Sequence, residues 1–494
     1  LIYDGTGHAP FMGDVAIQNG RIVAVGNVAR AGDPGKIIDV NGLAIAPGFI
    51  DVHTHAENII YHPNAENFLR MGVTTLVLGN CGSSKLNLGE FYTKLERNGF
   101  SPNIASLIGH GTVRGQVMGG SLRRPPNATE LAAMKKVVDQ AMRDGALGMS
   151  TGLIYLPGVF ARTDELVALS KTVAAHGGIY ASHMRSEGTN IFNAIDEVCT
   201  IAEQAKLPAH ISHLKLAGRP MWGKHPQLLA HLDKARAEGI RLTHDQYAYT
   251  ASSTSLHQLL PDALIVGGAK AFTQRINNPK THRETVGWMK DRLLRRQRED
   301  YSYAVIAYHK NDKRFNGLNV KEAAKLRYGK DDLDHQISLI FEVETNGGAS
   351  AVFHGMHEDD ARAFLKHPHT MFASDSSVRV LNKGVPHPRG YGNAARFLGH
   401  YTRDKKQLKL EEAIRKLTSL PANTFKLKGR GMLKAGYAAD VVIFDPKEVR
   451  DNATFKRPHA YSTGFKYVIV NGQIIVKNDR HNGAGPGQII RRTQ

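Results

Sequence analysis

Cysteine and long apolar runs are scarce in this sequence, and each scarcity excludes a class of protein. The 494 residues include only two cysteines, Cys81 and Cys199, so a secreted scaffold held together by several disulfides is excluded. No uncharged apolar run reaches the length of about 18 residues that suggests a membrane-spanning helix. The chain begins at Leu1, without a methionine. We therefore expect a cytoplasmic protein, with a periplasmic or secreted one as the alternative because an upstream signal could have been removed.

Acidic residues are also outnumbered. The 45 Asp and Glu residues face 64 Lys and Arg residues, for a net charge of +19 at pH 7, which favours an anionic substrate or an acidic partner. The basic residues are spread along the chain, their densest run is LLRRQR around Arg295, and no helix-turn-helix, zinc-knuckle or RNP-type motif is present. We therefore expect a small-molecule substrate and no nucleic-acid partner. The oligomeric state stays open.

The two ends of the chain share one pattern of apolar and polar residues. Residues 1–46 and 431–494 alternate apolar and polar side chains, with Asn-Gly pairs at 19–20, 41–42 and 471–472. Alternation marks half-buried strands, and Asn-Gly between two such runs marks a hairpin turn. We therefore predict one small β-sandwich domain built from both termini.

Between these ends, residues 47–430 change period. Short apolar strands alternate with amphipathic segments of helical spacing, which is the pattern of a (β/α)8 barrel of the TIM type. A segment at about 255–350, between strands seven and eight, is too long for a bare loop. It is an insertion that either folds over the barrel mouth or serves only as packing. The eight strands are expected within residues 48–55, 73–82, 103–111, 146–155, 178–184, 208–214, 241–249 and 371–376.

Reactive side chains end several of these strands. His53 and His55 are two apart, so they share a face of an extended chain. Each such residue alone has a structural explanation, as a hydrogen-bonded histidine, a buried cysteine or a helix cap. Together, Cys, His and Asp at the catalytic end of a barrel suit zinc, with the carboxylate moving a proton from water to a leaving amine. The strand-end residues are His53, His55, Cys81, His110, His183, His213 and Asp375.

The motifs around these residues make the chain resemble the amidohydrolase superfamily, and within it the D-aminoacylase (N-acyl-D-amino-acid deacylase) family. The resemblance spans nearly the whole chain. Its stretches are GFIDVHTH at 48–55, GNCG at 79–82, GHG at 109–111, TGLIYLPG at 151–158, SHMRSE at 182–187, ISHLK at 211–215, YTASST at 249–254, SDS at 374–376 and HPRGYG at 387–392.

The resemblance implies a zinc hydrolase that cleaves the amide bond of N-acyl-D-amino acids. Many superfamily members bridge two metals with a carboxylated lysine on strand four, but GMSTGLIY at 148–155 holds no lysine, and Cys81 takes that place. By resemblance, Cys81, His183 and His213 hold one tightly bound Zn²⁺. A weaker second position is formed by His53, His55 and Asp375 together with Cys81. Asp375 is also the general base that assists attack of zinc-bound water, and then the acid.

The same resemblance assigns the substrate contacts. Lys215 and Arg389 bind the α-carboxylate, helped by Tyr247 and Ser253, and Tyr155 hydrogen-bonds the scissile carbonyl or its oxyanion. His110, His244 and His257 keep their structural interpretation.

Three departures touch the pocket and leave the amino acid open. Ser376 stands where the family has glycine, the stretch 375–389 is longer, and DQYAY replaces DxYPY. One alternative is another amidohydrolase acting on a cyclic amide (hydantoin or dihydropyrimidine) or a dipeptide-like substrate. A more distant alternative is a polyanion-binding protein on a degenerate hydrolase scaffold.

Overall fold

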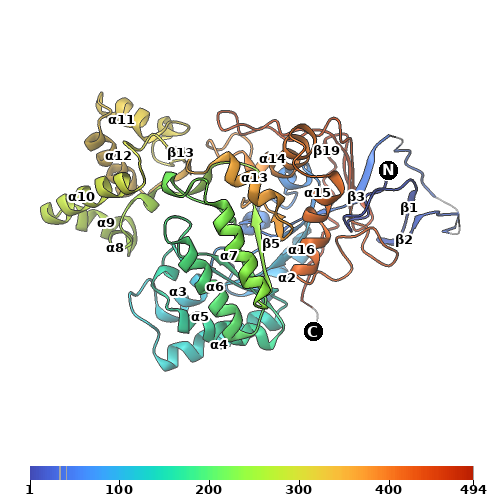
Figure 1. Ribbon diagram of the computed structural model, residues 1–494, viewed down its shortest axis with the longest axis horizontal. Helices are drawn as coiled ribbons and strands as arrows, with labels where there is room; N and C mark the ends of the chain where they lie inside the picture. The colour runs from blue at the N-terminus through green and yellow to red at the C-terminus, as the bar shows by residue number, and fades with distance from the viewer. Residues whose placement is uncertain (30, 33–34, 41, 493–494) are drawn as a thin grey trace.

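The computed structural model describes residues 1–29, 31–32, 35–40 and 42–492. Its centre is a set of short parallel strands alternating with helices (Figure 1). Nearly every residue of these strands is buried, as expected where helices cover a parallel sheet. The strands are β4 (Phe49–Asp51), β5 (Val73–Leu78), β6 (Asn103–Ser106), β7 (Ile108–Gly109), β8 (Gly148–Gly152), β9 (Ile179–His183), β10 (Ala209–Ile211), β11 (Leu242–Gln246) and β15 (Thr370–Phe372).

The predicted alternation of strands and helices is confirmed, but the hydrogen-bonded ladder does not close into a barrel. Strands β4, β5 and β6 form one parallel sheet, and β7 to β11 with β15 form another. The third predicted strand is interrupted at Leu107, which separates β6 from β7. Beyond the ends of β4 and β15, a bridge joins Thr54 to Ser376, and Asp375 N donates to His53 O and His55 N to Ser376 O, both at 2.8 Å.

The helices form where amphipathic spacing coincides with a capping residue. In α4, Asn127 Oδ1 accepts from Glu130 N and Glu130 Oε2 accepts from Asn127 N, both at 2.8 Å, which is a capping box. The same helix buries Met134, Val138 and Ala141 along one face. The other helices of the middle region are α1 (Glu66–Leu69), α2 (Leu88–Asn98), α3 (His110–Met118), α4 (Ala128–Arg143), α5 (Thr163–Ala175), α6 (Ile191–Ala205), α7 (His225–Ala237), α13 (Glu358–Lys366), α14 (Arg389–Arg396), α15 (Leu410–Leu417) and α16 (Ser419–Thr424).

Strands from both ends of the chain come together. Strands β3 (Ala44–Pro47), β16 (Val441–Phe444), β17 (Phe465–Val470), β18 (Gln473–Lys477) and β19 (Arg480–His481) form an antiparallel sheet, and β1 (Asp14–Gln18) pairs with β2 (Arg21–Gly26). Apolar residues of both sheets share one cluster. The predicted Asn-Gly turns at 19–20 and 471–472 join β1 to β2 and β17 to β18, with positive φ at all four residues. The turn predicted at Asn41 begins outside the described residues. The domain boundaries at 46/47 and 430/431 stay a prediction.

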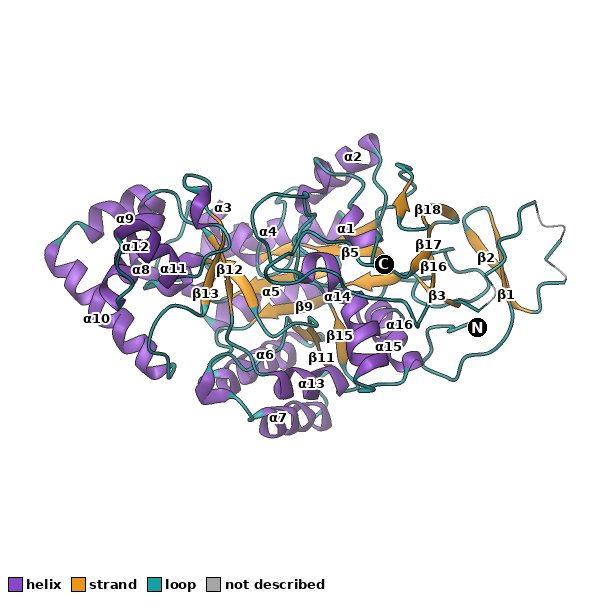
Figure 2. Ribbon diagram, turned by 90° about the horizontal axis from the view of Figure 1, so that it is seen from above, coloured by secondary structure: helices purple, strands orange, loops and turns teal. Residues whose placement is uncertain are grey.

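The long segment between β11 and β15 builds its own sheet and core. Strand β14 pairs with both β12 and β13, and a separate apolar cluster includes Phe272, Met289, Phe315 and Ile340. Figure 2 shows the parallel strands between this insertion and the terminal sheet. The elements of the insertion are β12 (Ser252–Ser255), α8 (Asp262–Ile265), α9 (Gly268–Ile276), α10 (Pro279–Arg295), β13 (Ala304–Tyr308), α11 (Val320–Tyr328), α12 (Leu333–Thr345) and β14 (Ser350–Phe353).

Within the described ranges, no helix combines the length and apolar character needed to cross a bilayer.

One buried carboxylate joins the terminal sheet to the parallel strands. Asp440 Oδ1 accepts from Asn471 N at 2.9 Å, and its Oδ2 accepts from Asn103 Nδ2 at 3.0 Å. The same Oδ2 pairs with Arg430.

Because Asp440→Ala leaves a buried guanidinium unpaired, we expect it to lower the free energy of unfolding by about 3–5 kcal/mol, measured by urea denaturation. Glu448→Ala, which breaks the exposed pair with Lys466, is the control and should change stability little. Equal losses in both variants would contradict the role given to Asp440.

Candidate metal centre and active site

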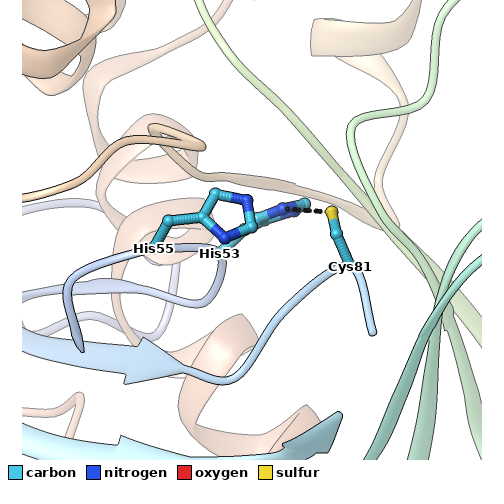
Figure 3. Close-up of side chains that lie close together, drawn as sticks. All are labelled: His53, His55 and Cys81. Carbon is cyan, nitrogen blue, oxygen red and sulfur yellow. Dashed lines mark hydrogen bonds between the residues drawn. The ribbon is translucent and has the colours of Figure 1, made fainter. Parts of the chain in front are cut away.

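The predicted ligands converge at the carboxyl ends of the parallel strands. Cys81 Sγ lies 3.2 Å from His53 Nε2, 3.6 Å from His213 Nε2 and 3.7 Å from His183 Nδ1. Figure 3 shows Cys81 facing the ring of His53, with His55 beside it. Three sets of potential ligand atoms lie within 4.8 Å of one another: His53, His55 and Cys81; Cys81, His183 and His213; and His53, His213 and Asp375.

Three of these residues adopt an unusual backbone conformation. Cys81, His213 and Asp375 have φ of 52°, 38° and 49°, a region that residues other than glycine rarely enter and that costs about 1–3 kcal/mol each. Each follows closely on the end of a parallel strand, β5, β10 or β15. The turn of the backbone ends the strand and places the side chain among the others. The site therefore stores backbone strain that the surrounding packing must support.

Glycines next to Cys81 allow neighbouring strand ends to approach closely. A Cβ on Gly152 would lie 2.1 Å from Cys81 O, and a Cβ on Gly82 would lie 2.7 Å from Gly152 N. Gly82 also has a φ of 75°. The GNCG and STG stretches therefore need glycine at these positions, because any side chain would push Cys81 away from the histidines.

The charge distribution favours a metal cation. Burial by itself raises the pKa of the Cys81 thiol, but the charge of His53 and hydrogen bonds from His183 and His213 outweigh it and hold that pKa well below its ordinary value. Burial likewise raises the pKa of Asp375, but the Arg389 guanidinium and His53 hold it well below the usual range. A thiolate with imidazole nitrogens suits Zn²⁺. The buried residues present therefore fit a zinc ion.

Two carboxylates that the sequence analysis did not single out orient the histidines. Asp245 Oδ2 lies 3.2 Å from His53 Nδ1 and 2.8 Å from His210 Nε2, and its Oδ1 accepts from His213 N at 2.9 Å. A proton held on His53 Nδ1 by this carboxylate leaves Nε2 with a free lone pair for a metal. Asp245 is the residue before the last one of strand β11 and lies two residues before Tyr247, so the strand-end rule applied to DQYAY would have found it.

Glu187 plays the equivalent part for His213. Its Oε1 lies 2.9 Å from His213 Nδ1 and accepts from Lys215 Nζ at 2.5 Å. With Nδ1–H donating to Glu187, His213 Nε2 faces Cys81 as a free ligand atom. The SHMRSE stretch contained Glu187, and its position four residues after His183 was the available signal.

The predicted substrate contacts gather on one side of these ligands. Lys215 Nζ lies 5.7 Å from the centroid of the Tyr247 ring, and Arg389 Cζ lies 4.6 Å from it. Arg389 Nη1 pairs with Asp375 Oδ2 at 2.8 Å and its Nη2 donates to Ser253 O at 3.4 Å. Arg389 Nε is buried and makes no hydrogen bond. An unsatisfied buried donor of this kind fits an absent carboxylate.

Tyr155 packs against the predicted metal ligands. Its ring centroid is 4.8 Å from that of His183, and its hydroxyl accepts from Thr254 Oγ1 at 3.3 Å. Burial, with the charge of Cys81, raises the pKa of Tyr155 well above its ordinary value. The phenol therefore keeps its proton and can donate it in a hydrogen bond.

Two adjoining cavities of about 660 Å³ and 770 Å³ open at these strand ends. Both are lined by Tyr155, Ser253, Thr254 and Asp375. Ser253 and Thr254 belong to β12, so the insertion contributes directly to the walls of both cavities.

The remaining predictions fall outside the three ligand sets. His110 Nε2 lies 2.8 Å from Glu165 Oε1, His244 Nε2 lies 2.7 Å from Thr370 Oγ1, and His257 Nδ1 lies 2.9 Å from Ser255 Oγ. These contacts agree with the structural interpretation of all three.

The position of Ser376, where the family has glycine, accommodates a serine in this chain. Its backbone forms the bridge to Thr54, and its Oγ accepts from Arg379 Nε at 3.0 Å.

Comparison with known proteins gives consistent matches. Residues 36–476 match the amidohydrolase family. A D-aminoacylase of Alcaligenes xylosoxydans xylosoxydans is 33% identical, over 100% of this chain and 96% of the relative. An N-acyl-D-glutamate deacylase of the same organism is 32% identical, over 99% and 95%.

A solved structure matches over the same length. The N-acyl-D-glutamate deacylase of Bordetella bronchiseptica, complexed with zinc and a phosphonate inhibitor that mimics the tetrahedral intermediate, has a TM-score of 0.84 and 29% identity, covering 99% of this chain and 98% of that one.

We predict that Asp245→Asn weakens zinc binding about 10- to 100-fold, because the variant no longer fixes the protonation of His53. Competition with a chromogenic zinc chelator measures the affinity. Asp196→Asn is the matched control, because Asp196 also pairs with a histidine, His231 at 2.7 Å, but outside this site. It should leave zinc affinity unchanged. Wild-type affinity in Asp245→Asn would refute the role of this carboxylate.

Proposed function

This chain belongs to the amidohydrolase family, in its D-aminoacylase branch, and from that premise we propose that it hydrolyses the amide bond of N-acyl-D-amino acids to a carboxylate and a free D-amino acid. The observation that carries the proposal is the buried Cys-His-His set beside an ionised Asp375 and two cationic anchors. The relatives that match this chain over nearly its full length act on N-acyl-D-amino acids by their names. The intact ligand set also argues against a degenerate, polyanion-binding scaffold.

Cys81, His183 and His213 are the proposed ligands of a tightly bound zinc ion. His53, His55 and Asp375, with Cys81, form the proposed weaker position. When bound, zinc lowers the pKa of a coordinated water towards about 7 and polarises the substrate carbonyl. The zinc present in the structure of the Bordetella bronchiseptica deacylase supports the same metal for this chain.

Asp375 is the proposed proton carrier. Its Oδ2 is held by Arg389, while its Oδ1 faces His55 Nε2 at 3.2 Å and His53 Nε2 at 3.5 Å. The low pKa of this carboxylate keeps it ionised at neutral pH. Oδ1 therefore accepts a proton from the attacking water and delivers it to the leaving nitrogen.

The other anchors hold the substrate for that transfer. Arg389 and Lys215 bind the α-carboxylate, the first through its unused Nε. Tyr247 and Ser253 support this end of the substrate. The protonated Tyr155 hydroxyl donates to the carbonyl oxygen as negative charge develops on it.

A panel of paired N-acetyl-D- and N-acetyl-L-amino acids, with hydantoin and dihydropyrimidine, tests the proposal. We expect turnover of D-configured linear amides, and little turnover of L-amides or rings, in zinc-loaded protein assayed for released amine. Preferential ring opening would instead establish the cyclic-amide alternative.

Replacement of Asp375 by Ala removes the proton carrier. We expect kcat to fall by about 100- to 10,000-fold, while tightly bound zinc, measured by atomic absorption, stays near the wild-type level. Near-normal turnover would show that the proton transfer is assigned to the wrong residue.

The two metal positions predict an order of zinc loss. Cys81→Ser should lose more tightly bound zinc than His53→Ala, because Cys81 belongs to the tighter set. Metal content after dialysis measures both variants side by side. The opposite order would overturn the assignment of the tight position.

A further inference from the structure

Arginines line the wall of the larger cavity at a distance from the proposed metal ligands. Arg292 and Arg295 lie in the last turn of α10, Arg296 is the C-cap residue directly after it, and Arg298 follows. Helix α10 belongs to the insertion, on the side of the molecule away from the terminal strands (Figure 1). The same cavity is lined by His183, His213 and Asp375. This arginine wall and the proposed catalytic groups therefore share one space.

Three of the six Lys and Arg residues that line this cavity are paired with carboxylates. Lys215 pairs with Glu187 at 2.5 Å, Arg185 with Glu197 at 2.9 Å, and Arg295 with Asp291 at 2.6 Å. Among the residues that the structure describes, no carboxylate lies within ion-pairing distance of the other three arginines of the wall, which are Arg292, Arg296 and Arg298. In the described structure these three arginines therefore form no direct ion pair, and the one nearby carboxylate on the insertion that lines the same cavity, Asp262, offsets only part of the charge of Arg292.

Two of these arginines are held in place. Arg292 Nη1 donates to Gln258 O at 2.5 Å, and its Cζ lies 5.0 Å from the Trp288 ring centroid. Arg298 Nη2 donates to His354 O at 2.8 Å, and its Cζ lies 4.9 Å from the Tyr303 ring centroid. A guanidinium has five N–H donors, so one hydrogen bond each leaves donors for a ligand.

A helix C-terminus attracts cations, which accounts for Arg295 and Arg296 without any ligand. It does not account for Arg292 and Arg298, because both donate to carbonyls outside α10. Burial, together with the charge of Arg296, lowers the pKa of Arg292 to about 10. An anion in the cavity would relieve this unfavourable environment.

We propose that Arg292, Arg296 and Arg298 bind a second anionic group of the substrate, so that the preferred substrates are N-acyl amino acids with a carboxylate distant from the scissile amide. This inference rests on the proposed function, in which the α-carboxylate is bound by Lys215 and Arg389. The second carboxylate belongs either to the amino-acid side chain or to the far end of the acyl group.

Matched substrate pairs test the inference in zinc-loaded, full-length protein. N-acetyl-D-glutamate is compared with N-acetyl-D-glutamine, and N-succinyl-D-alanine with N-butanoyl-D-alanine. We expect kcat/KM to be at least about tenfold higher for the charged member of one pair, as one charge-assisted hydrogen bond would provide, and that pair identifies the end that carries the carboxylate. Equal kcat/KM values within both pairs would overturn the proposal and leave the proposed function standing.

Charge reversal locates the preference. Arg296 is exposed and has no ion pair in the described structure, so Arg296→Glu should fold normally. We expect it to raise KM for the preferred charged substrate about tenfold with little change for the neutral partner. Arg283→Glu makes the same charge change on α10 at an exposed residue that does not line the cavity, and it should change neither. An equal effect of Arg296→Glu on both substrates would refute direct recognition.

A binding measurement decides the inference without turnover. Calorimetric titration of the zinc-loaded protein with glutarate and with butyrate should show tighter binding of the dicarboxylate, weakened about tenfold by Arg296→Glu and not by Arg283→Glu. Unchanged glutarate affinity in Arg296→Glu would overturn the proposal. If no D-configured amide is hydrolysed, the proposed function fails, and the titration still tells whether this wall binds a carboxylate.

Discussion

Cys81 Sγ lies within 3.2 to 3.7 Å of imidazole nitrogens from three different strands, and the arrangement of the strand ends depends on this contact. Bringing a thiolate into a buried position requires cationic or hydrogen-bonding partners, because an isolated buried charge is strongly unfavourable. The histidines provide them, and they in turn need carboxylates behind them. Asp245 and Glu187 occupy those places. The centre is therefore a compensated network in which each charged group is stabilised by its neighbours.

The backbone around this network is also unusual. Cys81, His213 and Asp375 leave the extended conformation directly after their strands, at positive φ. Beyond the ends of β15 and β4, the two segments are connected by the Thr54–Ser376 bridge, by backbone hydrogen bonds from Asp375 N to His53 O and from His55 N to Ser376 O, and by Ser374 N donating to the Asp51 carboxylate. The backbone strain is acceptable because the glycines beside Cys81 permit close approach and because the side chains gain their partners. The strained backbone thus serves to bring the strand-end side chains together.

Charge links this centre to the rest of the molecule. The chain carries a net charge of +19, and some of the positively charged residues line the cavity. Lys215 and Arg389 are balanced by Glu187 and Asp375, whereas the insertion adds three arginines that form no direct ion pair among the described residues. The insertion has its own sheet and core, so it can vary in its cavity-facing residues while the strands that hold the metal ligands stay unchanged.

The sequence by itself determined the alternation of strands and helices, the antiparallel texture of both ends and the residue types at the strand ends, because these follow from local periodicity and spacing. The motifs also led to the family that the comparisons confirm. The tertiary structure alone decided that the ladder stays open, that Asp245 orients His53 across 192 positions, and that Arg292, Arg296 and Arg298 line the same cavity as the catalytic groups. These features depend on contacts between residues far apart in the chain, whose distances and charge balance no local pattern specifies.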